Sequence, residues 1–186
     1  MVGVDLNMAM LRRAEQARRT GHITWPRRRV GQVFDTATAA TAELPRDRVA
    51  FVCADVATLP FDDAAFAGAL SLNVLDCVPS PVAHLLELGR VIADHGAALV
   101  STPYDWTTTA AAMEHWIGGH SQRGEHGGAS EPELRRLLSA DLRTGIDTGL
   151  TIADERPAVP WHLTLNARSV MHYQLHLLRL ARTARG

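Results

Sequence analysis

Three polar residues stand where three apolar runs of the sequence end, and their types suit the binding of a nucleoside. Asp5 follows Val2–Val4, Asp55 follows the run from Val49, and Asn73 follows the run from Phe66. An ionised carboxylate only accepts hydrogen bonds, so Asp5 could hold a ribose diol and Asp55 an exocyclic adenine amine. A single Asp after a strand is more often a turn or helix cap. Three such residues in register favour a ligand crevice at the carboxyl ends of parallel strands.

The elements around these residues predict alternating strands and helices. The runs ending at Asp5, Asp55 and Asn73 are apolar on both faces, which is typical of strands in a helix-covered parallel sheet. Asn7 is a good N-cap for a helix that ends at Gly21. Apolar residues at helical spacing between residues 79 and 96 predict a second helix, and a strand follows over residues 97–102. This βαβ series predicts an α/β, Rossmann-like, doubly wound and mostly parallel sheet.

The remaining segments carry weaker patterns. Residues 22–48 read as an insertion with an extended piece at 23–25 and a short helix over 36–44. Residues 104–130 predict a long loop, followed by a helix over 131–138 that Ser130 caps. Residues 150–154 and 171–180 predict an antiparallel hairpin at the sheet edge. We therefore expect a single domain over 1–186, with a core at 1–103, a lid at 104–148 and a C-terminal hairpin at 149–186.

Composition limits the classes of partner. The 19 Lys and Arg residues balance 20 Asp and Glu residues, so the net charge of −1 gives no general attraction to nucleic acid or to an anionic membrane. The two cysteines lack C-x-x-C spacing, and neither a membrane-spanning segment nor a signal peptide is recognisable. We expect a cytoplasmic protein that binds a small molecule, without a metal, because the spacing of His115, His120 and His126 fits no metal-ligand pair.

Two stretches carry a resemblance to a known family. The sequences VGVDLNMAMLRRA and FVCADVATLPF, with the text that continues to Pro103, resemble class I S-adenosylmethionine-dependent methyltransferases. The resemblance implies S-adenosylmethionine as the cofactor. It also implies a role for five residues: Asp5 binds the ribose hydroxyls, Leu6 packs on adenine, Asp55 meets the adenine amino group, Val56 lines the same pocket, and Asn73 lies beside the transferable methyl.

A narrower resemblance concerns the methyl acceptor. The segments 73–76, 101–106, 116–119 and 159–162 are similar to the methyltransferase domain associated with mercaptohistidine N-methylation in ovothiol synthesis. This similarity implies a small polar acceptor that bears an imidazole or a thiol. On the substrate side, Asp76 and His120 are candidate general bases, and the rings of Tyr104 and Trp106 could stack on a flat acceptor or contact the sulfonium. The aromatic residues could equally just cover the sheet edge.

The sequence departs from the family in one respect. No counterpart of the family's first strand and G-x-G-x-G turn precedes Val2, so we expect an N-terminally truncated member in which the first central strand is missing. The two flanking strands would then pair directly, or a partner chain or second copy would fill the gap. A non-catalytic interaction protein that has lost cofactor binding is the alternative function, and a nucleotide-sugar or NAD enzyme of related fold is a third.

Overall fold

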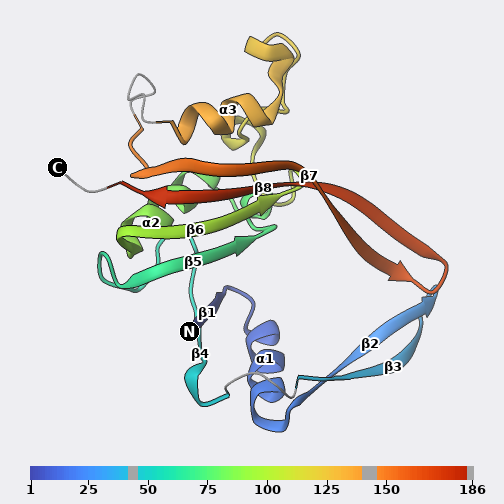
Figure 1. Cartoon of the computed structure of the whole chain (residues 1–186). Helices are drawn as coiled ribbons and strands as arrows, with labels where there is room; N and C mark the ends of the chain where they lie inside the picture. Colours follow the sequence, from blue (N-terminus) through green and yellow to red (C-terminus); the bar gives the residue numbers. More distant parts are fainter. Residues whose placement is uncertain (42–45, 140–145, 184–186) are drawn as a thin grey trace. The chain divides into compact units, whose positions relative to one another are not determined.

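The computed structural model describes residues 1–41, 46–139 and 146–183, and its chain divides into two compact units. The first unit comprises Met1–Val56 and His162–His172, and the second comprises Ala57–Trp161 and Tyr173–Gly186. Figure 1 shows the elements of both units, coloured along the sequence.

The first unit begins with the strand and helix that the sequence predicts. Strand β1 (Val2–Asp5) pairs in parallel with β4 (Ala50–Cys53), so that Asp5 lies opposite Cys53. Helix α1 (Met8–Thr20) starts at Asn7, whose side chain accepts a hydrogen bond from the Ala9 N–H. The helix ends at Gly21, which has a φ of 75°. A left-handed residue after the last turn is the usual place for glycine. The predicted strand–helix unit is confirmed.

The insertion after α1 is a β-hairpin. Strands β2 (His22–Val30) and β3 (Val33–Ala40) pair antiparallel, with Trp25 opposite Ala37. The short helix expected over residues 36–44 is therefore wrong for 36–40, and residues 42–44 lie outside the described residues. Threonines on facing positions explain the difference, because the Thr24 and Thr38 hydroxyls lie 3.2 Å apart across the two strands. Such cross-strand pairs stabilise a sheet more than the isolated propensity of alanine stabilises a short helix.

The second unit contains a mixed four-stranded sheet in the order β5-β6-β8-β7. Strand β5 (Phe66–Leu72) pairs in parallel with β6 (Ile92–Thr102), and β6 pairs antiparallel with β8 (Ser169–Arg182). Strand β7 (Leu150–Asn166) is the neighbour of β8, so the predicted C-terminal pair of strands is present and longer than expected. Strand β1 pairs with β4 within the first unit and β5 pairs with β6 within the second, and the predicted closure of the gap left by a missing first strand stays a prediction.

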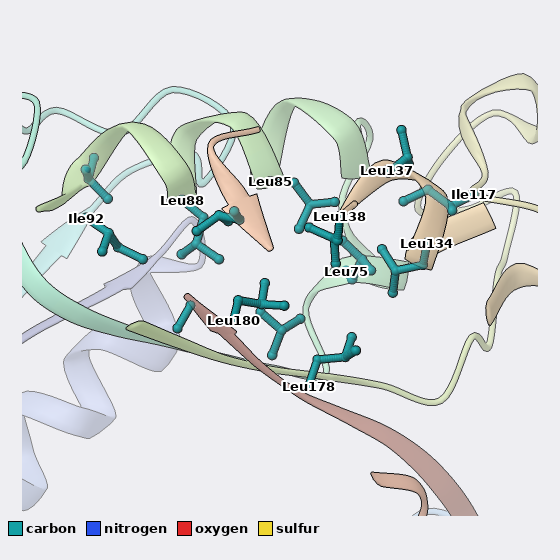
Figure 2. Close-up of a cluster of buried hydrophobic side chains, with 14 residues drawn as sticks. Leu75, Leu85, Leu88, Ile92, Ile117, Leu134, Leu137, Leu138, Leu178 and Leu180 are labelled. Carbon is teal, nitrogen blue, oxygen red and sulfur yellow. The ribbon is translucent and has the colours of Figure 1, made fainter. Parts of the chain in front are cut away.

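Helix α2 (Pro81–Val91) covers one face of this sheet, and its buried side chains form a hydrophobic core with those of the sheet. In Figure 2, Leu85 and Leu88 of α2 lie over Leu178 and Leu180 of β8, together with Leu134 from helix α3 (Ser130–Leu137). The other face of β5 differs from the sequence expectation of a strand buried on both sides. Leu70 is 69% exposed and Leu72 is 51% exposed, although Ser71 between them is buried. The apolar run therefore predicted the strand correctly, but the strand is less buried than the run predicted.

Helix α3 spans Ser130–Leu137, close to the predicted limits, but its N-terminus differs from the prediction. The N-cap residue is Ala129, and the side chain of Ser130 is not used as a cap. The Ser130 hydroxyl instead accepts a hydrogen bond from the indole N–H of Trp106 at 2.9 Å. Within the described parts of the chain, none of the helices has the length and apolar character that crossing a membrane requires.

Candidate functional site

The first unit brings together the four residues expected at the adenosine. Asp5 ends β1, and Asp55 stands two residues beyond Cys53, the parallel partner of Asp5. One carboxylate oxygen of Asp5 accepts the Asn7 N–H at 2.7 Å. A carboxylate has about four lone-pair sites, so most of its capacity remains for a ligand. Leu6 is 68% exposed beside it, and Asp55 and Val56 are half-buried. A carboxylate next to an accessible leucine fits a ribose with its attached base.

In the second unit, Asn73 directly follows the carboxyl end of β5. Its φ is 55°, in the left-handed region, which asparagine adopts more readily than most residues other than glycine. Ser101 of β6 holds it there, because the Ser101 hydroxyl donates to Asn73 Oδ1 at 2.7 Å and the Asn73 N–H donates to the Ser101 carbonyl at 2.9 Å. The end of β5 is thus fixed to the end of β6.

Asp76 is buried and holds the end of β6. It is 2% exposed, and its two oxygens accept hydrogen bonds from the Thr102 hydroxyl at 3.2 Å and from the Asp105 N–H at 2.9 Å. The structure therefore brings Asp76 to the segment that contains Tyr104 and Trp106. Its hydrogen bonds give it a clear role in shaping that segment, and its predicted role as a general base stays a prediction.

Tyr104 also has a left-handed backbone, with a φ of 56°, and its N–H donates to the Thr102 hydroxyl at 3.0 Å. Its side-chain hydroxyl lies 2.6 Å from Nδ1 of His176. Burial raises the pKa of the Tyr104 phenol well above its usual value, so the phenol keeps its proton at neutral pH. Asn73 directly follows β5, and Tyr104 stands two residues after the end of β6, the parallel neighbour of β5.

Trp106 belongs to a cluster of three half-buried rings, which we call the aromatic cluster: Tyr104, Trp106 and Trp116. The rings of Trp106 and Trp116 are stacked, with centroids 6.2 Å apart and planes 15° apart. The ring of Tyr104 lies 6.5 Å from that of Trp106. The Trp106 indole is fixed by Ser130 and the Trp116 indole by the carbonyl of Ala111, at 3.0 Å. The cluster is a rigid aromatic surface that could bind a flat or cationic group.

His120 lies in a different environment. It is exposed and lines a pocket of about 510 Å³, whose lining includes neither Asp76 nor Tyr104. The pocket also contains Glu114, Glu125 and the ion pair of Glu133 with Arg136 at 2.9 Å. The two predicted general bases, Asp76 and His120, therefore do not line the same pocket. In the described ranges, no group of three or more His, Cys, Asp or Glu side chains is arranged to hold a metal ion.

Sequence reasoning missed three residues behind Tyr104. His176 of β8 is 1% exposed, Glu155 of β7 accepts a hydrogen bond from its Nε2 at 2.8 Å, and Arg135 of α3 pairs with Glu155 at 3.0 Å. The alternating residues Tyr173, Leu175 and Leu177 lie on one face of β8. His176 lies on the other face with Leu178 and Leu180, and only the pairing of Thr102 with His176 brings it to Tyr104. The signal available in the sequence was a polar residue, His176, on an otherwise apolar face of a strand.

Comparison with known proteins decides the family. A model of the methyltransferase domain matches residues 1–100, more than half of the chain. The chain belongs to the methyltransferase domain family. It is a class I methyltransferase, as the stretches around Asp5 and Asp55 indicate. No match was found among curated protein sequences.

Solved structures support the methyltransferase fold. An S-adenosylmethionine-dependent methyltransferase from Methanosarcina mazei is 17% identical, with a TM-score of 0.58, over 99% of this chain and 82% of that one. A putative methyltransferase from Bacillus halodurans is 12% identical, with a TM-score of 0.55, over 98% and 83% of the two chains. A putative methyltransferase from Haloferax volcanii, in complex with the Trm112 activator, is 14% identical, with a TM-score of 0.54, over 100% and 72%. At these identities the likeness shows the fold alone.

Proposed function

We propose that this methyltransferase-family chain transfers a methyl group from S-adenosylmethionine to a small nucleophile. The observation that carries the proposal is the pair of carboxylates at the ends of β1 and β4, with an exposed leucine beside them in a chain that matches the methyltransferase domain. Asp5 and Asp55 would hold the ribose and the adenine amine, and Leu6 and Val56 would contact the base. Asn73 would lie near the methyl.

The chain's own contribution to the reaction is orientation. S-adenosylmethionine supplies the electrophilic methyl group when bound. The backbone at Asn73 and Tyr104 is fixed by hydrogen bonds to Ser101 and Thr102, so groups at these two strand ends need no reordering when an acceptor arrives. Holding two reactants in line favours such a displacement, because it removes the entropic cost of bringing them together. The aromatic cluster would exclude water and stack on the acceptor.

The acceptor itself is the finer part of the proposal. A small molecule with an imidazole or thiol is consistent with the aromatic cluster and with the resemblance of the segments around Tyr104 and Trp116. Asp76 and His120 are the proposed general bases for such an acceptor. We also propose that the two compact units belong to one methyltransferase-like domain, since the family match over residues 1–100 includes parts of both.

Adenosine is the simplest probe of the proposal. Titration of the full chain, followed through the methyl resonances of Leu6, should show saturable shifts in the wild-type protein. Asp5→Asn should weaken adenosine binding by about tenfold or more, because hydrogen bonds to a charged group contribute about 1.5–3 kcal/mol. Asp47→Asn, an exposed carboxylate of the same unit, is the matched control and should bind as the wild type does. Equal affinity of the Asp5 and Asp47 variants would refute the assignment of Asp5.

A further inference from the structure

A chain of hydrogen bonds leads from the aromatic cluster through the interior of the second unit to its surface. Tyr104 Oη lies 2.6 Å from His176 Nδ1, and His176 Nε2 lies 2.8 Å from a carboxylate oxygen of Glu155. The Arg135 Nε–H donates to both oxygens of Glu155, at 3.0 and 3.1 Å. Loop, β8, β7 and α3 each supply one member, so His176 holds the Tyr104 hydroxyl, Glu155 holds His176 and Arg135 holds Glu155.

The protons along this chain can be assigned from its ends. Arginine is always charged, so Glu155 acts as an acceptor on its side of the chain. Burial raises the pKa of Glu155, and the hydrogen bonds from Arg135 and His176 lower it by more, so the group stays ionised. His176 Nε2 must then carry the proton that it shares with Glu155. Because Arg135 already balances the charge of Glu155, no second positive charge is needed, and the His176 ring can be neutral. Nδ1 of a neutral ring protonated on Nε2 is an acceptor for the Tyr104 hydroxyl.

We propose that His176 is a positioning residue of the acceptor site. It accepts the one hydrogen bond that the Tyr104 hydroxyl can donate, and the lone pairs of the Tyr104 oxygen remain for the methyl acceptor. A ligand at Tyr104 Oη must then donate a hydrogen bond. Together with the aromatic cluster, this selects a small flat ring that presents an N–H or O–H group. The inference rests on the proposed function only in identifying the ligand as the methyl acceptor. The binding preference holds with or without methyl transfer.

Two features of Tyr104 suit this role better than a purely structural one. Its left-handed backbone, at a φ of 56°, costs free energy that an ordinary covering residue would not need to spend. Its ring is only half-buried, so part of it faces solvent next to Trp106. The remaining charged groups that act on Tyr104 are Glu131 and Asp76, and both are acidic. They disfavour an anionic ligand and leave a neutral or cationic donor as the fitting partner.

The ring proton of His176 can be observed directly. Two-bond ¹H–¹⁵N correlation spectra of the full chain at neutral pH report the tautomer of each of the nine histidines, and His176→Asn identifies the signals of His176. We expect a neutral ring with the proton on Nε2. A proton on Nδ1, or a doubly protonated ring, would make His176 the donor toward Tyr104 and would overturn the proposal.

The ligand preference is tested with pyrazole and 1-methylpyrazole, flat rings that are uncharged at neutral pH and differ by one N–H group. We expect pyrazole to shift the Tyr104 ring resonances and to bind about threefold to tenfold more tightly than 1-methylpyrazole, which is what one neutral hydrogen bond contributes. Equal affinities, or no binding of pyrazole at Tyr104, would contradict the proposal. These probes need no cofactor, so failure of S-adenosylmethionine binding would refute the proposed function and leave this result standing.

Variants separate positioning from stability. Tyr104→Phe and His176→Leu should both lose the preference for pyrazole. His176→Asn should keep part of it, because its amide oxygen can accept from Tyr104 near the position of Nδ1. Tyr173→Phe removes the hydroxyl of the chain's other tyrosine, which donates to Asp105, and should keep the full preference. If His176→Leu remains folded by near-ultraviolet circular dichroism and keeps the preference, His176 has no positioning role.

Discussion

Removal of the Asp76 carboxylate should destabilise the second unit and release the segment after β6. In Asp76→Ala, the Thr102 hydroxyl, which is 0% exposed, and the Asp105 N–H both lose their acceptor. The hydroxyl can rotate toward another acceptor, whereas the N–H cannot. With about 1–3 kcal/mol for each unsatisfied group, we expect a loss of about 2–4 kcal/mol in the free energy of unfolding. For a chain of this size, that corresponds to about 4–16 °C in Tm.

Asp76→Asn provides an internal comparison. Its amide oxygen can accept the Asp105 N–H, and its NH₂ group can donate to the Thr102 oxygen, so we expect about half the loss of the alanine variant. Asp94→Ala, an exposed carboxylate on β6, is the control and should leave Tm unchanged. Thermal unfolding followed by tryptophan circular dichroism measures all three, because Trp106 lies in the affected segment. If Asp76→Ala unfolds at the wild-type temperature, the carboxylate does not anchor this segment.

Two further predictions concern charge and assembly. The Arg90 hydrogen bond lowers the pKa of Glu87 below the usual value of about 4.3, so the stability that this pair provides is present above that pH and is lost as the pH falls through the lower, folded-state pKa. The difference in Tm between wild type and Arg90→Met should therefore shrink in acid, and a constant difference would contradict this reading. We also propose that β5, which ends the strand order of its sheet and carries the exposed Leu70, pairs with a strand of a partner chain or second copy. Light scattering should give more than the monomer mass for the purified chain and the monomer mass for Leu70→Lys; a monomeric wild type would refute self-association.

Local signals allowed much of the fold to be predicted. Asn7 and Gly21 mark the two ends of α1, and the apolar runs before Asp5, Asp55 and Asn73 mark three strands. Caps and strand ends can be recognised because the residues that form them are adjacent in sequence. The same locality explains why the residues expected at the adenosine, which lie at the end of β1 and shortly after β4, are found in the same unit.

The errors arise where a distant partner decides the structure. Residues 36–40 are compatible with a helix or a strand, and the pairing of Thr38 with Thr24 selects the strand. Ser130 could cap α3, but Trp106 takes its hydroxyl. His176 contacts Tyr104 only through the register of β8 on β6, which no local pattern specifies. How far β5 is covered also depends on which elements pack against it, and the apolar run carries no such information.

Calorimetric titration of the full chain with S-adenosylmethionine tests the central claim most directly. The account predicts saturable binding at one site, weakened by Asp5→Asn and unchanged by Asp47→Asn. Absence of binding at millimolar cofactor, in a chain shown to be folded, would contradict it.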